Sequence, residues 1–271
     1  MPRPMHRPII AGNWKMHLGR VDEALAFVRS IRYQLNGIEG VDSVLCPPFT
    51  VLAAVAEVIR PTRIGLGAQT MHWEHQGAYT GEVSPAMLAR VCQYVILGHS
   101  ERRTGRVVHP DQAERTEGGF ESDVAVNRKV HAALSHGLTP IVCVGENLAQ
   151  NDAGQTQEFV GAQVCAALAG LTEKQAERCV IAYEPLWAIG TGRAATPSDV
   201  NRVIGLTVRG AIADMFGEPA AQRVRVQYGG SVNVDNIKAF MAMPEVNGAL
   251  VGGASLTPDF VELVRRAAPG P

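Results

Sequence analysis

The run Cys179-Val180-Ile181-Ala182-Tyr183 is apolar at every position and is followed directly by a carboxylate, Glu184. A strand with one face in water alternates apolar and polar residues, whereas a strand covered on both faces is apolar throughout. We therefore predict that residues 179–183 form a buried strand of a parallel sheet, with helices packed against it.

Seven further β-rich runs alternate with helical spacings along the chain. The eight predicted strands cover residues 8–13, 43–46, 64–68, 94–97, 140–144, 179–183, 224–228 and 248–251. Regular strand–helix units without a linker favour a closed parallel barrel over the alternative, a doubly wound open sheet. We predict an α/β fold with one (β/α)8 barrel domain over residues 1–271, in which the extension 1–7 and the tail 267–271 are mobile.

Two local patterns predict how helices lie and where they begin. Helical spacing places one set of side chains on the buried face of the first helix, with Ile31 beside them. This set is Val21, Leu25, Val28, Arg32 and Leu35. Three Ser/Thr–Pro pairs each predict an N-cap followed by proline at the first helical position. The pairs are Ser84-Pro85, Thr196-Pro197 and Thr257-Pro258.

The composition is ordinary for a soluble globular protein. Of 271 residues, 46% are hydrophobic and 19% are charged, and 25 basic residues against 26 acidic ones give a net charge of −1. Nothing in this balance indicates a nucleic-acid partner or an anionic membrane surface. The uncharged run over residues 130–145 contains Pro140 and is too short to span a bilayer.

The N-terminal residues and the cysteines predict a compartment. Residues 1–8 lack the apolar stretch of a signal peptide, so we expect a cytoplasmic protein that stays where it is made. The five cysteines are odd in number and include no C-x-x-C spacing, which favours buried reduced thiols. They are Cys46, Cys92, Cys143, Cys165 and Cys179.

Four polar side chains fall where predicted strands end, which is where a barrel carries its functional groups. Asn13 and Lys15 follow the first strand. His99 follows the fourth strand, and Glu184 ends the sixth. Each has an ordinary structural explanation when taken singly, such as a solvated lysine, a core histidine, or a carboxylate held extended before Pro185. Because these strand ends converge on one mouth, the set favours a functional site.

Glycine pairs follow the last two predicted strands. Tyr228-Gly229-Gly230-Ser231 comes after the seventh, and Val251-Gly252-Gly253-Ala254-Ser255 comes after the eighth. Glycines let the backbone approach a ligand closely, and successive N–H groups form a concavity for phosphate oxygens, although any turn uses glycine as well. A third segment, Trp187 to Gly192, has a short apolar body between small residues and is either a lid or an ordinary glycine-rich loop.

Five segments resemble the signature segments of the triose-phosphate isomerase family, in order along the chain from about Pro8 to about Arg266. They are Gly12-Asn13-Trp14-Lys15-Met16, Gly98-His99-Ser100-Glu101-Arg102-Arg103, Ala182-Tyr183-Glu184-Pro185-Leu186-Trp187-Ala188-Ile189-Gly190-Thr191-Gly192, Tyr228-Gly229-Gly230-Ser231-Val232 and Leu250-Val251-Gly252-Gly253-Ala254-Ser255-Leu256. The resemblance implies interconversion of dihydroxyacetone phosphate and D-glyceraldehyde 3-phosphate, with no metal and no cofactor.

The resemblance also implies a role for each site residue. Glu184 would be the base that moves a proton between two carbons, and His99 the electrophile that polarises the carbonyl and shuttles protons between the oxygens. Lys15, oriented by Glu101, would supply positive charge, and Asn13 would position the substrate oxygens. A proton α to a carbonyl is weakly acidic, so such a site needs both a base and groups that stabilise the enediolate. Phosphate would be held by Lys15 and by Gly190, Ser231, Gly252 and Gly253.

A homodimer is the remaining implication. Segment 69–83 would reach into a partner's pocket and bring Thr80 near the partner's active site, and its Met71, Trp73 and Tyr79 would expose apolar surface in a monomer. The largest departure from the family pattern is an extra segment, 104–119, which we expect to lie exposed on the rim as a tolerated insertion.

Two other interpretations stay open. A Schiff-base aldolase would use Lys15 as its nucleophile. A catalytically silent barrel, kept as a binding or scaffold protein, would have lost the base, the lysine or the histidine, and the sequence retains all three.

Overall fold

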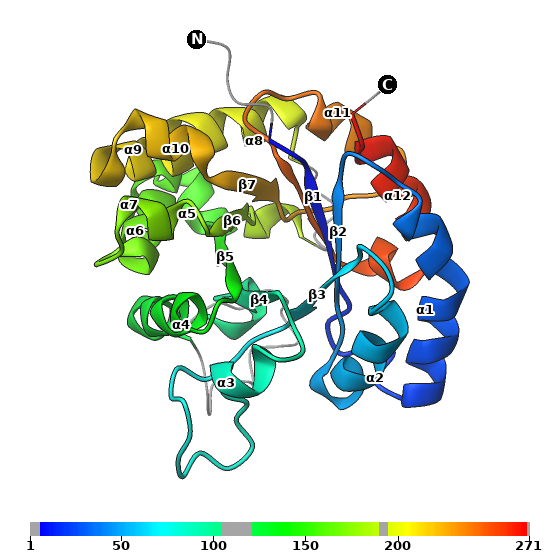
Figure 1. Cartoon of the computed structure of the whole chain (residues 1–271). Coiled ribbons are helices and arrows are strands. Elements are labelled where there is room, and N and C mark those ends of the chain that lie inside the picture. The colour runs from blue at the N-terminus through cyan, green and yellow to red at the C-terminus, as the bar shows by residue number, and fades with distance from the viewer. Residues whose placement is uncertain (1–5, 104–120, 190–194, 270–271) are drawn as a thin grey trace.

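A computed structural model of the chain describes residues 6–103, 121–189 and 195–269. At its centre, parallel strands form a closed barrel in the order β1 to β8, and helices surround it (Figure 1). The barrel closes between its first and last strands, where Ile9 lies opposite Gly248. The predicted (β/α)8 barrel is confirmed, and the alternative of a doubly wound open sheet is wrong.

The strands lie within one residue of their predicted bounds. They are β1 (Ile9–Asn13), β2 (Asp42–Cys46), β3 (Gly65–Ala68), β4 (Tyr94–Leu97), β5 (Thr139–Val144), β6 (Val180–Tyr183), β7 (Arg225–Tyr228) and β8 (Gly248–Val251). Each strand pairs in parallel with the next, so all carboxyl ends lie at one end of the barrel.

The helices connect these strands and cover the outside of the barrel. The α-helices are α1 (Val21–Asn36), α2 (Phe49–Ile59), α3 (Pro85–Leu88), α4 (Asp123–Ser135), α5 (Leu148–Asp152), α6 (Thr156–Leu168), α7 (Glu173–Ala176), α8 (Pro197–Val203), α9 (Gly210–Phe216), α10 (Glu218–Arg223), α11 (Ile237–Met241) and α12 (Asp259–Ala267). Short 3-10 turns are η1 (Ser100–Arg102), η3 (Leu186–Ala188) and η5 (Gly253–Leu256), and η4 (Ile204–Arg209) is a π-helical stretch.

Side chains from the strands form two separate apolar layers. In β1, Ile9 and Ala11 belong to a small cluster made of strand residues, whereas Ile10 belongs to a larger cluster shared with the helices. Successive side chains of a strand point to opposite faces, so the small cluster fills the barrel interior and the large one lies between barrel and helices. Burial on both faces explains why the strand sequences are apolar throughout.

The helix predictions are correct in part. Ser84 and Thr196 cap α3 and α8 through their side chains, but α12 begins at Asp259 without a side-chain cap from Thr257. The buried face of α1 consists of Ala24, Val28, Ile31 and Leu35. Val21 was predicted on this face and is 49% exposed, because it is the first residue of the helix.

The terminal segments predicted to be mobile extend beyond the described residues. Within the described part, Arg7 forms an ion pair with Asp42 at 2.8 Å, and Ala267 is buried as the last residue of α12. All five cysteines are free thiols, and four of them are buried. In the part of the chain that the structure describes, no helix combines the length and apolar character that a membrane crossing requires.

Candidate active site

The predicted site residues that the structure describes gather around one cavity at the carboxyl end of the barrel. Its volume is about 320 Å³. The lining residues are Asn13, Lys15, His99, Glu184, Ile189, Gly229, Gly230, Ser231, Val232, Asn233, Leu250, Gly252, Gly253 and Ala254. Gly190, also predicted for this site, lies outside the described residues. The space is sufficient for a small organic phosphate and too small for a polymer.

Lys15 is held in an unusual backbone conformation beside the end of β1. Its φ of +50° lies in the left-handed region, which costs energy for a residue with a side chain. Two hydrogen bonds hold it there: the Lys15 N–H donates to Oδ1 of Asn13 at 3.0 Å, and Nε2 of Gln69 donates to the Lys15 carbonyl at 2.8 Å. Gln69, which the sequence placed only in segment 69–83, therefore supports the site.

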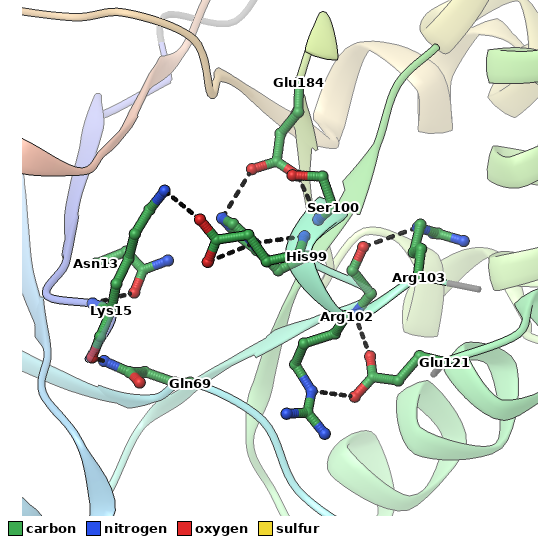
Figure 2. A network of polar contacts seen from close by, with 11 residues as sticks. Asn13, Lys15, Gln69, His99, Ser100, Arg102, Arg103, Glu121 and Glu184 are labelled. Atoms are coloured by element: carbon green, nitrogen blue, oxygen red, sulfur yellow. Dashed lines mark hydrogen bonds and ion pairs between the residues drawn. The ribbon is translucent and has the colours of Figure 1, made fainter. Parts of the chain in front are cut away.

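The Lys15 side chain is directed by an ion pair. Its Nζ donates to Oε1 of Glu101 at 2.6 Å, which joins the end of β1 to the turn after β4 (Figure 2). Both side chains are partly exposed at 31%, so the pair is screened by water and contributes more to orientation than to stability. The structure brings Glu101 and Lys15 into contact, as the resemblance implies.

His99 and Glu184 form a nearly buried pair across the cavity. Nε2 of His99 is 3.1 Å from Oε1 of Glu184, and Oε2 of the same carboxylate accepts the Ser100 N–H at 3.0 Å (Figure 2). The Glu101 N–H donates to Nδ1 of His99 at 3.2 Å, at the start of η1. A nitrogen that accepts a backbone N–H carries no proton, so the proton of a neutral imidazole lies on Nε2, the nitrogen that faces Glu184.

Two glycines make room for Glu184. A Cβ at Gly229 would lie 2.8 Å from Cγ of Glu184, and a Cβ at Gly145 would lie 1.8 Å from the Glu184 carbonyl oxygen. Neither distance is sterically possible without displacing the carboxylate or its backbone. The sequence assigned the Gly229-Gly230 pair to phosphate binding, and this second purpose of Gly229 depends on a residue 45 positions earlier in the chain.

The opposite wall of the cavity is made of backbone groups and small residues. Gly252 lies beside the Lys15 side chain, where an added Cβ would be 3.6 Å from Cε, and Gly253 is the first residue of η5. The Ser231 hydroxyl donates to the Ala188 carbonyl at 3.0 Å, which ties the loop after β7 to η3. Glycine N–H groups near a lysine form an environment suited to phosphate oxygens.

A buried carboxylate that the sequence did not single out fixes the strand bearing His99. Glu121 accepts hydrogen bonds from the Gly98 N–H at 2.8 Å, the Thr70 hydroxyl at 2.9 Å, Nε of Arg102 at 2.9 Å and Nζ of Lys129 at 2.6 Å. Burial alone would raise the pKa of Glu121, but the charge of Lys129 and these hydrogen bonds outweigh it and lower the pKa to about 2. The group is therefore an anion at neutral pH.

A second unpredicted carboxylate, Glu146, anchors η3. It is fully buried, and its Oε1 accepts hydrogen bonds from Nε1 of Trp187 at 2.8 Å and the Tyr183 hydroxyl at 3.1 Å. Burial, and next the charge of Glu146, raise the pKa of the Tyr183 phenol well above its usual value, so this hydroxyl stays a donor. The contact fixes the segment that begins with Trp187.

Cys143 lies beneath the pair and is not a nucleophile. Burial, followed by the charge of Glu184, raises the pKa of its thiol well above the usual value. A thiol that keeps its proton is unreactive toward carbonyl carbons. The fold and the cavity together define the class of protein as a phosphate-binding (β/α)8-barrel enzyme.

The comparisons with known proteins narrow this class to one family. The family model described as triosephosphate isomerase matches residues 8–267. A triosephosphate isomerase of Herpetosiphon aurantiacus is 48% identical over 263 residues, which is 96% of this chain and 99% of that protein. The chain belongs to the triosephosphate isomerase family.

Two further relatives carry the same name. The protein of Chloroflexus aurantiacus is 51% identical over 253 residues, 93% of this chain and 95% of the relative. The protein of Symbiobacterium thermophilum is 51% identical over 255 residues, 94% of each chain. The match to these proteins extends over nearly the whole barrel, so the resemblance noted from five short segments is confirmed.

Proposed function

We propose that this chain interconverts dihydroxyacetone phosphate and D-glyceraldehyde 3-phosphate through an enediolate intermediate. The observation that supports it most is the pair of Glu184 and His99 facing Lys15 across a cavity of about 320 Å³. Family membership supports the same conclusion, because the relatives are named triosephosphate isomerase.

Glu184 is the proposed base. The residue is 2% exposed, and its carboxylate accepts the Ser100 N–H and lies 3.1 Å from Nε2 of His99, so it must turn away from the Ser100 N–H to reach a substrate carbon. The proton that it takes from one carbon is returned to the neighbouring carbon, and His99 is proposed to carry the hydroxyl proton from one oxygen to the other, which completes the isomerisation.

His99 and Lys15 are proposed to stabilise the negative charge that then develops on oxygen. Nε2–H of His99 can donate to the substrate carbonyl once Glu184 has turned away. Lys15, fixed through Glu101, brings its positive charge to the same oxygen and to the phosphate, while Asn13 positions the substrate. Donors that are placed before the reaction need no reorganisation, which is the main source of rate enhancement in such sites.

The phosphate is proposed to bind the backbone N–H groups of Ser231, Gly252, Gly253 and Gly190. Three of these residues line the cavity, next to Lys15. The Trp187 to Gly192 segment is the proposed lid, which would exclude water from the enediolate. Its described beginning is tied to the phosphate side through the Ser231 hydroxyl and the Ala188 carbonyl. Every step is a proton transfer, so we propose that no metal or organic cofactor takes part.

The homodimer is also a proposal. Tyr79 is 45% exposed in segment 69–83 and its ring packs on His72, with centroids 4.3 Å apart. Met71, which was predicted to be exposed, is buried in its own barrel, and that prediction is wrong because the start of the segment packs inward. We propose that the exposed part of the segment contacts a second copy, with Thr80 near the partner's active site.

The pathway and compartment follow from the proposed reaction. The two triose phosphates are intermediates of glycolysis and gluconeogenesis, so the enzyme serves both. We propose a cytoplasmic location, which agrees with five free thiols, since disulfides are rare in that reducing compartment.

A coupled assay on the purified chain tests the reaction. Supplied with D-glyceraldehyde 3-phosphate and a dehydrogenase that consumes dihydroxyacetone phosphate, the chain should give saturable turnover, and it should do so in the reverse direction with the matching coupling enzyme. Borohydride with substrate separates the aldolase alternative, in which Lys15 forms a Schiff base that reduction would trap. A covalent adduct at Lys15 without isomerisation would contradict the proposal.

A further inference from the structure

Two histidines outside the cavity face each other at close range. His75 lies in segment 69–83, and His136 directly follows α4. Nδ1 of His75 is 3.1 Å from Nε2 of His136, and the rings are stacked with centroids 5.4 Å apart and planes 26° apart. The proposed reaction gives this pair no role.

The hydrogen bonds of His136 determine which of its nitrogens carries a proton. Its Nδ1 is 2.8 Å from the Ala132 carbonyl oxygen, which can only accept. Nδ1 therefore carries the proton, and in the neutral ring Nε2 presents its lone pair toward His75. An imidazole that donates one N–H to a carbonyl while the other nitrogen is unprotonated is the arrangement found in metal-binding histidines.

The distance between the two facing nitrogens fits a shared metal ion. Zn²⁺ binds imidazole nitrogen at 2.0–2.1 Å in tetrahedral geometry, which places two ligand nitrogens about 3.4 Å apart. The two nitrogens face each other nearly in line at 3.1 Å, so ion binding requires both rings to turn until their lone pairs meet at a point beside that line. We propose that His75 and His136 together bind Zn²⁺ or a similar nitrogen-preferring divalent ion.

The site would be weak and exchangeable. Among the described residues, no third histidine, cysteine or carboxylate gathers with the pair, so water would fill the remaining positions. Structural zinc sites have four protein ligands, and a site with two lacks most of that affinity. Its effect would be local: one ion would fasten segment 69–83 to the end of α4. The proposal does not depend on the isomerase reaction.

Metal binding changes which nitrogen of His75 carries the proton. Without metal, Nδ1–H of His75 donates to the lone pair of His136 Nε2. Metal binding needs both lone pairs, so His75 shifts its proton to its own Nε2 through solvent. A neutral pair then releases no net proton, and a pair holding one extra proton releases one.

Calorimetric titration of the whole chain with Zn²⁺ at pH 7.5 tests the proposal. The wild type should bind one ion per chain through this pair, and both His75→Ala and His136→Ala should weaken that binding at least about tenfold. His131→Ala is the matched control, because His131 lies on α4 and its Nε2 is 2.9 Å from the Ala169 carbonyl oxygen rather than near His75 or His136. It should bind as the wild type does.

Copper provides a second readout that does not depend on affinity. The electron paramagnetic resonance spectrum of bound Cu²⁺ should show two nitrogen ligands in the wild type and fewer in either variant. Should His136→Ala fail to fold by circular dichroism, His136→Gln replaces it. Equal Zn²⁺ affinity in all variants would overturn the proposal, and so would a loss confined to only one of the two, because a chelating pair requires both.

Discussion

Substitution of Glu184 is the most direct test of the proposed reaction. Replacing it with glutamine keeps the side-chain volume and removes the proton acceptor, while the cavity wall of Ser231, Gly252 and Gly253 is untouched. Loss of general-base catalysis costs about 10²–10⁴-fold, so kcat of Glu184→Gln should fall by at least that factor with little change in KM. Steady-state kinetics in the coupled assay measure both constants.

An exposed carboxylate supplies the control for this substitution. Glu158→Gln changes a solvated residue in the first turn of α6 and should leave kcat and KM unchanged. Near-normal turnover of a folded Glu184→Gln protein would place the base elsewhere. It would favour the ordinary explanation, in which the residue is only a strand-end carboxylate before Pro185.

Gln69 gives a prediction about positioning rather than chemistry. Gln69→Leu removes the hydrogen bonds to the carbonyls of Lys15 and Cys46, at 2.8 and 2.9 Å. With its strained backbone released, Lys15 should lose its placement, and kcat/KM should fall about 10- to 100-fold. The Cys46 carbonyl keeps the Trp14 N–H at 3.1 Å, but loss of the donor to the Lys15 carbonyl should also lower the free energy of unfolding by about 1–3 kcal/mol. Kinetics and urea unfolding test these effects separately, and unchanged kcat/KM would show that Lys15 needs no such support.

The site residues that could be predicted from the sequence differ from the others in the polarity of their sequence neighbours. Asn13 and Glu184 interrupt strongly apolar strands, so their polarity is visible against the run that precedes them. Glu121 lies in polar surroundings in the sequence, where a buried carboxylate looks the same as a solvated one, whereas Glu146 comes two residues after the apolar run 140–144 and could have been found by the strand-end signal. Their burial depends on partners such as Lys129 and Trp187, which the fold supplies.

At the scale of elements, strands were predictable to within a residue because burial on both faces makes them apolar throughout. The π-helical stretch η4 was not predictable from local pattern. Its last residue, Arg209, is buried and pairs through Nε with Glu245 at 2.9 Å. This partner lies 36 residues further along the chain, so no local spacing indicates it.

The Glu121 contacts join the root of segment 69–83, the end of β4 and α4, and they predict a pH dependence of stability. The pKa of Glu121 is lowered from 4.5 to about 2 in the folded state. The unfolded chain therefore binds a proton first, so this contribution is present above about pH 4.5 and is lost as pH falls toward 2. The shift corresponds to about 3 kcal/mol.

Glu121→Gln should remove that contribution. At pH 7 the free energy of unfolding should fall by about 3–5 kcal/mol, because Lys129 would remain buried without its anion. Between pH 4.5 and 2, stability should decline less steeply than in the wild type. Urea unfolding at several pH values measures both, with the exposed Glu39→Gln as control. An unchanged pH slope would show that another carboxylate dominates acid unfolding.

The extra segment 104–119 lies outside the described residues, and its role as a tolerated insertion stays a prediction. The residues on either side are close together: Arg103 and Glu121 form a β-bridge, and the Glu121 N–H donates to the Arg102 carbonyl at 2.5 Å. A short link can therefore replace the segment. Deleting Arg106 to Glu117 should leave kcat within about tenfold, and near-total loss in a folded deletion protein would assign the segment a function.

Across the whole molecule, the site is assembled by contacts between distant parts of the chain. Lys15 and Glu101 are 86 positions apart, and the Ser100 N–H reaches Glu184 over 84 positions. Each contact joins different strands of one closed barrel. Separate strand–helix units cannot hold these groups in place, so catalysis requires the complete barrel, and loss of activity in denaturant should coincide with loss of its structure.

Assembly into a dimer is the prediction at the largest scale. Tyr79 exposes 45% of its surface in segment 69–83, and an exposed aromatic residue in a projecting segment is typical of an interface. Tyr79→Asp should place a charge in that interface and weaken dimerisation by about 2 kcal/mol or more, about thirtyfold in Kd. Sedimentation velocity should show a wild-type dimer and a concentration-dependent variant whose specific activity falls on dilution. Tyr33→Asp, at a tyrosine 71% exposed on α1, should remain dimeric and active. Fully active wild-type monomers at assay concentration would contradict both the dimer and the proposed role of Thr80 near the partner's active site.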